Sequence, residues 1–454
     1  MENRLLIRGA TILTMSSHGT LEGDILIEGN RLVQVGGTAP PGSGPDQTAT
    51  RTIQADGLVA MPGLVQVHVH LCQSLFRGMA DDLELLPWLA ERIWPLEAAH
   101  DEDTLYWSAL LGIAELFRGG TTCIGDMETV HHTEAALTAM GEAGIRAVSG
   151  KVMLDRVPPG WPATGSAADT LVQPASRALE ETAALGEKWH GAAEGRIHYA
   201  VCPRFALSCS ESLLRGAADL ARSRDYLLHT HAAENRDEVA LVRREHGCGN
   251  VEYLDSIGLL GRRTLLAHCV HLSPAEEEIL ARTGTGVAHC PSANLKLGSG
   301  VAALARLRRL GVRAGIGADG APCNNNLDAL AEMRLASLLQ KEREGPASIP
   351  AGEALRLATI EGAGCLGLEE EIGSLEPGKR ADLILVDLSG PHCLPAGEPV
   401  TTLAYAARAA DVRFTVVDGR VVLEEGRLVT VDETVLAREV RRSAGLVRRR
   451  AGLN

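Results

Sequence analysis

The middle of the chain alternates short apolar runs with longer segments of helical periodicity. Apolar runs of this length, rich in Val, Ile and Leu, predict strands that are buried on both faces, as in a parallel sheet. The predicted strands are 63–67, 121–125, 147–153, 196–202, 227–231, 264–269, 286–289 and 312–317. The predicted helices between and after them are 105–117, 133–143, 168–189, 210–222, 234–245, 274–281, 301–310 and 328–340. Eight such repeats predict an α/β fold of the (β/α)8 TIM-barrel class. A doubly wound sheet would carry an early Gly-rich phosphate turn, and the sequence has none.

Both ends of the chain have a different pattern, in which short alternating strands are separated by Gly-containing turns. Near the C-terminus, Asp418-Gly419 lies between two apolar runs, which is typical of a hairpin tip. The shared pattern predicts that the two ends form one small β-sandwich domain from residues 1–60 and 372–430. The barrel is then predicted over residues 61–371, and a C-terminal helix over 431–454.

Composition narrows the possible partners and the compartment. The chain has 454 residues, is 45% hydrophobic and carries a formal net charge of −14, which argues against polyanionic partners. The arginine-rich end, residues 438–450, has the pattern of a solvated helix face, so we predict no nucleic-acid binding. No apolar run reaches the 18 residues of a membrane span. The ten cysteines form no CxxC pair, and we expect a reducing, cytoplasmic setting without a signal segment.

Metal-binding side chains recur where the predicted strands end. His68 and His70 stand two residues apart, so in a strand both imidazoles leave the same face and can reach one metal ion. Later predicted strands end at or near His231, His268, His289 and Asp319. In a barrel of this class the active site lies at the carboxyl ends of the strands. Together these residues predict a metal centre there, although each histidine taken singly would be ordinary.

The motifs around these residues resemble the amidohydrolase superfamily, and within it the zinc aminohydrolase branch. The matching segments are Pro62-Gly63-Leu64-x-x-x-His68-x-His70, His231-x-x-Glu234, Leu266-Ala267-His268, His289-Cys290-Pro291-x-x-Asn294, Gly317-Ala318-Asp319-Gly320 and Gly373-Ser374-Leu375-Glu376-Pro377-Gly378-Lys379-x-Ala381-Asp382-Leu383. Each motif alone is weak evidence, but the set spans nearly the whole chain and is specific.

The resemblance implies a role for each strand-end residue. His68, His70, His231 and Asp319 would hold one divalent metal ion, for which zinc is the best fit and Fe2+ is possible.

The remaining residues would act on the water and the substrate. Glu234 would take a proton from the activated water and deliver it to the ring nitrogen beside the attacked carbon. His268 would orient the water or the developing oxyanion, and Asp319 could also accept a proton. His229 shares a face with His231, and we expect it to support a ligand rather than bind metal. Lys151 could be carboxylated in a two-metal site, but its place in the third strand favours one metal.

The stretch after His70 resembles the deaminases of methylthioadenosine, S-adenosylhomocysteine and 5′-deoxyadenosine. That resemblance implies a purine nucleoside substrate attacked at C6 with release of ammonia. Glu97 would bind ribose hydroxyls, and Trp88 would pack on the substrate. As a structural alternative, Glu97 is only a helix-start carboxylate beside Pro95. Asn294 also fits the nucleoside group.

The sequence leaves other substrates and one non-catalytic role open. Arg204 stands where many nucleoside deaminases have His, and Arg204-Phe205 with Gln73 resembles guanine deaminase, where such residues bind the guanine edge. Guanine or 8-oxoguanine is therefore an alternative substrate, and the triazine aminohydrolases and chlorohydrolases share the scaffold. A non-catalytic scaffold relative would lack metal ligands, and this chain has the full set. Related enzymes are often homo-oligomers, although no surface pattern in the sequence indicates one.

Overall fold

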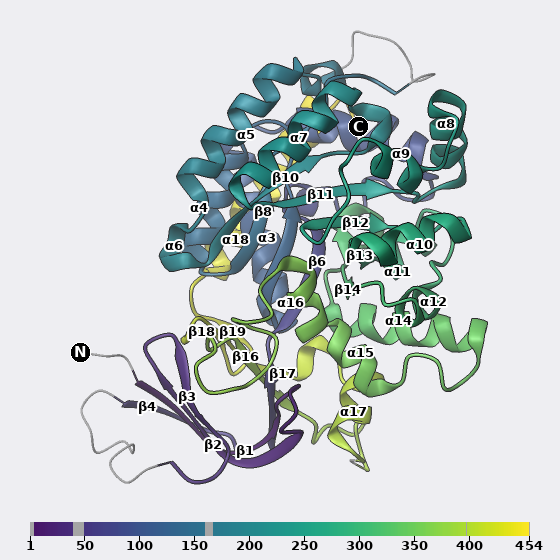
Figure 1. The fold of residues 1–454 in the computed structure, drawn as a ribbon. Coiled ribbons are helices and arrows are strands. Elements are labelled where there is room, and N and C mark those ends of the chain that lie inside the picture. Colours follow the sequence, from purple (N-terminus) through teal and green to yellow (C-terminus); the bar gives the residue numbers. More distant parts are fainter. Residues whose placement is uncertain (1–3, 40–49, 159–166, 396, 454) are drawn as a thin grey trace.

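The barrel is closed, as predicted. A computed structural model describes residues 4–39, 50–158, 167–395 and 397–453 of the protein. Its barrel strands are β6 (Leu64–His70), β7 (Thr121–Met127), β8 (Arg146–Gly150), β10 (Ile197–Pro203), β11 (Leu227–Ala232), β12 (Thr264–His268), β13 (Gly286–His289) and β14 (Ala314–Ile316). They pair in parallel in chain order, and β14 returns to pair with β6, which closes the ring (Figure 1). The short strands β9 (Val152–Met153) and β15 (Asp319–Gly320) extend it. The doubly wound alternative is excluded.

Helices cover the outside of the barrel (Figure 1). They include α3 (Glu102–Arg118), α4 (Thr133–Ala143), α5 (Ala175–Trp189), α7 (Glu211–Arg224), α8 (Arg236–His246), α10 (Pro274–Thr283), α12 (Leu304–Arg309), α14 (Ala329–Glu344), α15 (Ala351–Leu357) and α16 (Ile360–Leu366). The helix predicted over 168–189 was placed too early. A 3-10 turn covers Ala167–Leu171, and α5 begins only after Pro174, which has the extended backbone of a helix-starting position.

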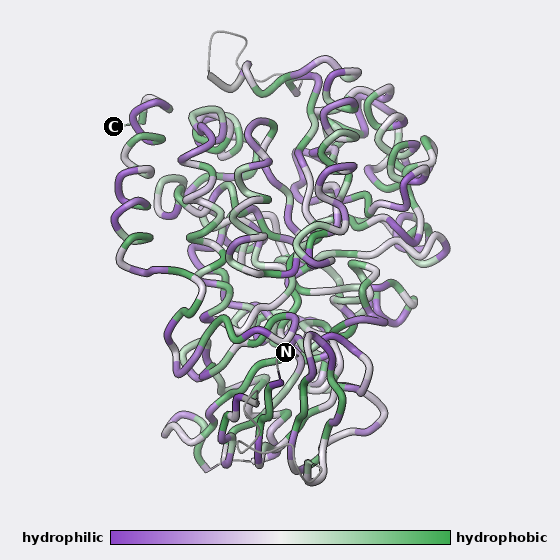
Figure 2. The backbone as a smooth tube through the Cα atoms, turned by 90° about the vertical axis from the view of Figure 1, so that its left-hand side faces the viewer, coloured by the Kyte–Doolittle hydropathy of each residue, from purple (hydrophilic) through white to green (hydrophobic). Residues whose placement is uncertain are grey.

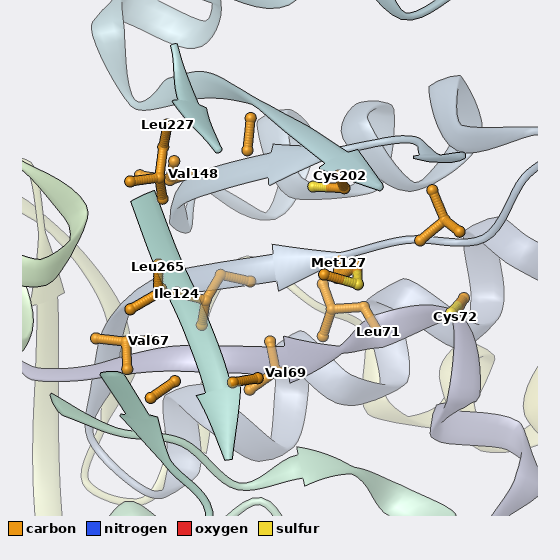
Figure 3. Close-up of a cluster of buried hydrophobic side chains, with 14 of the residues drawn as sticks. Val67, Val69, Leu71, Cys72, Ile124, Met127, Val148, Cys202, Leu227 and Leu265 are labelled. Atoms are coloured by element: carbon orange, nitrogen blue, oxygen red, sulfur yellow. The ribbon is translucent and has the colours of Figure 1, made fainter. Parts of the chain in front are cut away.

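The strand β6 separates an apolar face from a polar one. On the apolar face, Val67 and Val69 belong to a buried hydrophobic cluster that also contains Ile124 and Met127 of β7 (Figure 3). The intervening side chains, His68 among them, contact β11, which is not a sheet neighbour of β6. The contact therefore crosses the barrel interior, and the period of two along the strand places the histidines there.

The segment after β6 forms one wall of the barrel mouth. It contains the 3-10 helix η1 (Leu71–Phe76), the single turn α1 (Leu85–Trp88), a π-helical turn at Leu89–Ile93 and α2 (Trp94–Ala98). A π-helical turn is rare and is frequent at functional sites.

Strands from both ends of the chain form a single nine-stranded sheet. Its order is β19-β18-β17-β16-β5-β1-β2-β3, with β4 beside β1. The strands are β1 (Arg4–Leu13), β2 (Thr20–Glu28), β3 (Arg31–Val35), β4 (Thr50–Gln54), β5 (Leu58–Pro62), β16 (Leu383–Asp387), β17 (Val412–Val417), β18 (Arg420–Glu424) and β19 (Arg427–Leu428). On β16, Leu383 and Leu385 belong to the core of this sheet, whereas Ile384 and Val386 belong to a core shared with helices of the barrel. The predicted pairing of the two ends is confirmed.

The C-terminal helix α18 (Glu433–Arg450) packs along α3. Its buried residues Leu436, Ser443 and Val447 recur at helical spacing and so lie on one side. Figure 2 shows hydrophilic and hydrophobic stretches alternating along this helix. Arg442 pairs with Asp103 at 2.5 Å and Arg450 with Asp101 at 2.8 Å. The arginine-rich end is thus one face of a docked helix. Among the described residues, no helix is long and apolar enough to span a bilayer. The exact domain boundaries stay a prediction.

A buried ion network joins the barrel to the terminal sheet. Arg146 of β8 binds Asp382 through two hydrogen bonds of 2.8 and 3.0 Å and Asp418 through one of 3.0 Å. All three side chains are 1% exposed. Asp382 also accepts the backbone N–H of Asp418 at 2.7 Å. Without Arg146, Asp382 would lose both of its bonds to the guanidinium, and Asp418 would keep only the longer ion pairs with Arg380 at 3.3 Å and Arg196 at 3.7 Å.

We therefore expect Arg146→Met to lower the free energy of unfolding by about 3–5 kcal/mol, because breaking a buried ion network leaves uncompensated charge. Urea unfolding followed by circular dichroism measures the change. Arg413→Met is the matched control, since Arg413 pairs with Glu425 at the surface, where such pairs contribute about 0–1 kcal/mol. Equal losses in the two variants would contradict a special role for the buried network.

Candidate active site

Three strand ends, those of β6, β11 and β15, bring the four predicted metal ligands to one point inside the barrel. Asp319 Oδ1 lies 3.4 Å from His68 Nε2 and 3.3 Å from His70 Nε2. His231 Nε2 lies 3.2 Å from His70 Nε2. All four residues are buried or nearly so. The residues that the sequence predicted as a set are thus in mutual contact.

The histidines are held so that their free nitrogens face each other. His70 Nδ1 donates to the carbonyl of Met127 at 2.6 Å, and His231 Nδ1 donates to the carbonyl of Arg204 at 2.7 Å. Because a carbonyl only accepts, each Nδ1 carries the proton and each Nε2 presents a lone pair. Two lone pairs 3.2 Å apart repel unless a cation lies between them.

His68 presents its Nε2 in the same way. His68 Nδ1 lies 2.9 Å from His229 Nε2, while His68 Nε2 is buried and has no hydrogen-bond partner among the described residues. Burial lowers the pKa of His68 to about 4 and that of His231 well below its ordinary value, which keeps both imidazoles neutral. The pKa of His70 is raised despite its burial, because Asp319 lies beside it. Three imidazole nitrogens and one carboxylate oxygen suit a divalent metal such as zinc.

Backbone strain is concentrated around this point. Asp319 has φ = 63°, His268 76°, Cys269 48° and Ala233 53°, all in the left-handed region that non-glycine residues avoid. Such conformations persist where packing enforces them, and they cluster at functional sites. Although burial alone would raise the pKa of Asp319, its contacts with His68 and His70 hold that pKa well below the usual range. Asp319 is therefore ionised, as a metal ligand must be.

Glu234 and His268 form a pair beside the metal ligands. Glu234 Oε2 lies 3.3 Å from His268 Nε2, and Glu234 Oε1 is buried without a partner among the described residues. Burial, and then the charges of Asp319 and Glu238, raise the pKa of Glu234 well above its ordinary value. His268 Nδ1 donates to Asn294 Oδ1 at 2.9 Å. Glu234 can therefore hold a proton next to the site, and Asn294 orients His268.

Glu238 holds the backbone of the Glu234 turn, a role that the sequence interpretation missed. Its carboxylate accepts the backbone N–H groups of Glu234 at 2.7 Å, Ala233 at 3.3 Å and Asn235 at 3.4 Å. The amide of Asn250 adds a bond of 2.6 Å. A signal was present, because Asn235 and Glu238 have the spacing of a capping box at the start of α8.

A pocket opens over these residues, with about 420 Å³ of atom-free space that includes open solvent at its mouth. Its lining residues are His70, Gln73, Leu85, Trp88, Leu89, Arg204, Phe205, His231, Glu234, Glu238, His268 and Asp319. Four predicted substrate-binding residues thus face the cavity: Gln73, Trp88, Arg204 and Phe205. The other two, Glu97 and Asn294, lie behind this lining.

Glu97 is bound by Arg204 and Gln73. Arg204 Nη1 and Nη2 donate to the two carboxylate oxygens of Glu97 at 2.6 and 3.1 Å, and Gln73 Nε2 donates at 2.9 Å. Gln73 Oε1 is left buried without a partner among the described residues. Glu97 is only 3% exposed, so ribose could reach it only after the Arg204 fork moved.

Lys151 points away from the metal ligands. Its Nζ donates to Gln173 Oε1 at 2.7 Å and to the carbonyl of Val152 at 3.3 Å, and it lies 3.5 Å from Glu181 of α5. The side chain lines a separate groove beside α4 and α5. This placement supports the prediction of a single metal ion.

His229 supports His68 rather than the metal, so we expect His229→Ala to weaken metal affinity about 10–100-fold without abolishing binding. Equilibrium dialysis against a zinc buffer measures the change. His289→Ala is the control, because His289 also ends a barrel strand and is buried but has no hydrogen-bond partner among the described residues. Complete loss of metal in the His229 variant would instead make His229 a ligand.

Comparisons with known proteins identify the family of this chain. The model of the Amidohydrolase family matches residues 59–422. A 5-methylthioadenosine/S-adenosylhomocysteine deaminase of Desulforamulus reducens is 40% identical over 97% of this chain and 98% of its own length. A 5′-deoxyadenosine deaminase of Methanothermobacter thermautotrophicus is 41% identical over 95% of this chain and 96% of its own. The crystal structure of a Xanthomonas campestris adenosine deaminase with bound zinc covers 98% of both chains at 31% identity, with a TM-score of 0.85. The family predicted from the motifs is thus confirmed, and the chain belongs to the amidohydrolase family.

Proposed function

We propose that this protein is a hydrolytic deaminase that releases ammonia from C6 of an adenine nucleoside such as 5′-deoxyadenosine, methylthioadenosine, S-adenosylhomocysteine or adenosine. The observation that carries the proposal is the facing arrangement of His68, His70, His231 and Asp319, with Glu234 beside them at the cavity floor. The names of the relatives at about 40% identity support the nucleoside class.

The four ligand residues fit a divalent metal, for which zinc is the proposed identity. When bound, such an ion lowers the pKa of a water molecule from 15.7 toward roughly 7. Glu234 takes the proton of the attacking water and delivers it to the ring nitrogen next to C6, which converts the amidine carbon into a tetrahedral centre. His268, whose Nδ1–H is held by Asn294, presents Nε2 to the oxygen that develops there and orients it, and it could donate to that oxygen only after Nε2 takes up a proton. Collapse of this centre needs a second proton on the amino group, and the remaining hydrogen of the water-derived hydroxyl supplies it. Asp319 or Glu234 would accept that proton and pass it on, so that the C6–N bond breaks and ammonia leaves as the carbonyl forms.

The cavity walls match a flat heteroaromatic ring. Trp88 and Phe205 offer apolar surface, and Gln73 and Arg204 offer polar groups for ring nitrogens. A mostly apolar pocket with few convergent polar groups is the usual form of a small-molecule site.

Guanine or 8-oxoguanine is the second candidate, and the locked position of Glu97 favours it. With Glu97 bound by Arg204 and Gln73, the residue implied to bind ribose does not line the cavity. The residues that do line it, Arg204 and Gln73, are those implied to bind a guanine edge. A triazine ring would fit the same walls. For a nucleoside to bind, the Glu97 carboxylate must exchange an Arg204 contact for ribose hydroxyls.

The proposal includes a cellular setting. The described cysteines are all free thiols, which fits a reducing cytoplasm. A homo-oligomer is retained as a prediction. The scaffold alternative is disfavoured by the complete set of ligands, and elemental analysis of the gently purified protein tests it, because a scaffold would hold no stoichiometric metal.

Glu234→Gln should lower kcat by about 10²–10⁴-fold while metal content stays unchanged, because the amide cannot carry the proton. Ammonia release coupled to glutamate dehydrogenase measures turnover, and elemental analysis measures metal. Glu245→Gln on the neighbouring helix is the control, since Glu245 is a surface residue paired with Arg156. Near-normal turnover of the Glu234 variant would remove the role assigned here.

An ammonia-release screen over adenosine, 5′-deoxyadenosine, methylthioadenosine, S-adenosylhomocysteine, guanine and 8-oxoguanine decides between the two substrate classes. We expect the nucleosides to react, and we expect Arg204→Lys to raise their KM by about tenfold or more with a smaller change in kcat. Lysine keeps the charge but loses the planar set of donors that Arg204 presents to the ring nitrogens at the cavity wall, which acts on binding rather than on the reacting bond. Turnover of guanine without any nucleoside activity would replace the first proposal by the second.

A further inference from the structure

A second cluster of metal-binding side chains lies outside the catalytic cavity. It is formed by the connection between β16 and the helix α17 (Pro399–Tyr405) and by the 3-10 turn Ala409–Asp411 that precedes β17. A ring nitrogen of His392, the thiol of Cys393 and a carboxylate oxygen of Asp411 lie within 4.8 Å of one another. α17 is at the lower end of the molecule in Figure 1, and none of these residues lines the catalytic cavity.

Each of the three residues keeps a ligand atom available. His392 Nε2 is 2.8 Å from Asp411 Oδ2, which also accepts the backbone N–H of Arg408 at 2.8 Å. Among the described residues, neither the Cys393 thiol nor Asp411 Oδ1 takes part in a hydrogen bond. The cluster is partly sheltered, because Cys393 is 5% exposed and the His392 and Asp411 side chains are 25% and 13% exposed.

Gly390 leaves room for the His392 ring in its present place. A Cβ at position 390 would lie 2.8 Å from Cε1 and 3.0 Å from Nδ1 of the ring. The first distance is shorter than real contacts allow, so any side chain there would displace the imidazole. With Nδ1 turned toward Gly390, Nε2 is the nitrogen that faces Asp411. It carries the hydrogen that it donates to that carboxylate, and it would bind a metal once this proton moves to Nδ1 or to solvent.

We propose that His392, Cys393 and Asp411 form a second binding site for a divalent cation of the zinc class, with water completing the coordination. A tetrahedral zinc with these ligands separates the donor atoms by about 3.3–3.6 Å, as follows from bond lengths of about 2.0–2.3 Å. The donor atoms here are already within 4.8 Å, and the His392–Asp411 hydrogen bond would open by about half an ångström. Ligands of N, S and O type select zinc over magnesium or calcium, which bind through oxygen.

The charge of the site balances. The carboxylates of Asp411 and Asp387 and the guanidinium groups of Arg408 and Arg334 lie close enough to act on the Cys393 thiol, so the surroundings of the cluster carry both signs of charge. A bound thiolate and the Asp411 carboxylate together neutralise a divalent ion, so the guanidinium groups face a neutral complex. The thiol proton is released to solvent on binding, as for any cysteine ligand.

The site would be structural. The metal would tie the segment before α17 to the turn after it, which closes a loop around that helix. Cys393 before α17 and Leu403 within it both belong to the core that the terminal sheet shares with the barrel. Binding to the folded state alone stabilises it by mass action. The proposal is independent of the reaction catalysed at the barrel mouth.

Metal stoichiometry and cobalt spectroscopy on the full-length holoprotein test the proposal. The wild type, saturated at the catalytic centre, is dialysed against Zn2+ or titrated with Co2+. We expect a second metal equivalent and, with Co2+, a thiolate-to-metal charge-transfer band. Cys393→Ser and His392→Gln should each weaken this second equivalent by at least about 100-fold, the upper end of what loss of a supporting residue causes. Cys248→Ser, which alters a partly exposed cysteine elsewhere, should leave it unchanged.

Deaminase activity and the melting temperature without added metal show whether the variants are folded. We expect both to match the wild type, while added Zn2+ raises the melting temperature of the wild type and of Cys248→Ser but not of the two cluster variants. Absence of a second equivalent in the wild type would overturn the proposal. So would a second equivalent that persists in both cluster variants, because the metal would then bind elsewhere. Failure of the nucleoside screen would leave this result unaffected.

Discussion

The lone pairs of His70 and His231, 3.2 Å apart across the barrel, impose the constraint on which the site depends. The backbone carbonyls of Met127 and Arg204 keep each Nδ1 protonated, so neither ring can turn its lone pair away without losing a buried hydrogen bond. Asp319 places an anionic oxygen beside them. Only a cation relieves this arrangement. The strained backbone at Asp319 and His268 is therefore understandable as the geometric cost of directing these groups to one point.

The same packing that builds the metal centre also shapes the substrate wall. Arg204 contributes its carbonyl to His231 and its guanidinium to Glu97, so one residue couples the ligand geometry to the cavity lining. Its side chain is fully desolvated, and a buried guanidinium requires a partner. Glu97 meets that requirement in the absence of substrate. The preference between a nucleoside and a free base then becomes a competition for one carboxylate, rather than a question of cavity size.

The terminal sheet is part of the scaffold rather than an appendage. Arg146 reaches from the barrel strand β8 to two carboxylates of that sheet, and the helix α18 clamps α3 on the outer surface. The residues of the Arg146 network do not line the cavity, whereas α18 also contacts η1 and α2 in the wall of the barrel mouth. The His392–Cys393–Asp411 cluster lies in the connection between β16 and β17 of the terminal sheet. A bound ion would hold the two ends of this connection together. The residues at the barrel mouth thus form the candidate active site, and the contacts of the terminal sheet stabilise the fold.

Sequence patterns alone predicted much of this protein. The alternation of apolar runs with helical periodicity predicted the eight barrel strands, because burial on both faces leaves a recognisable composition. The spacing of His68 and His70, with histidines at later strand ends, predicted the metal ligands, because carboxyl ends of parallel strands converge whatever the loops do. The strand period and the barrel topology predicted only that these side chains cluster. The ligand set and the role of Glu234 came from the resemblance of motifs such as His231-x-x-Glu234 to the amidohydrolase family.

Tertiary structure decided what depends on contacts between distant segments. The ion pair of Glu97 with Arg204 joins residues far apart in the chain, so no local pattern could predict that Glu97 lies behind the cavity lining. The direction of Lys151 was likewise set by packing against Gln173 and Glu181. The spacing of Asn235 and Glu238 indicated a capping box, but the sequence did not show that the Glu238 carboxylate accepts three backbone N–H groups around Glu234, because this depends on how the turn folds. Sequence determined which chemical groups reach the barrel mouth, and the fold determined which of them face the substrate, since orientation follows from the partners that each buried polar group must find.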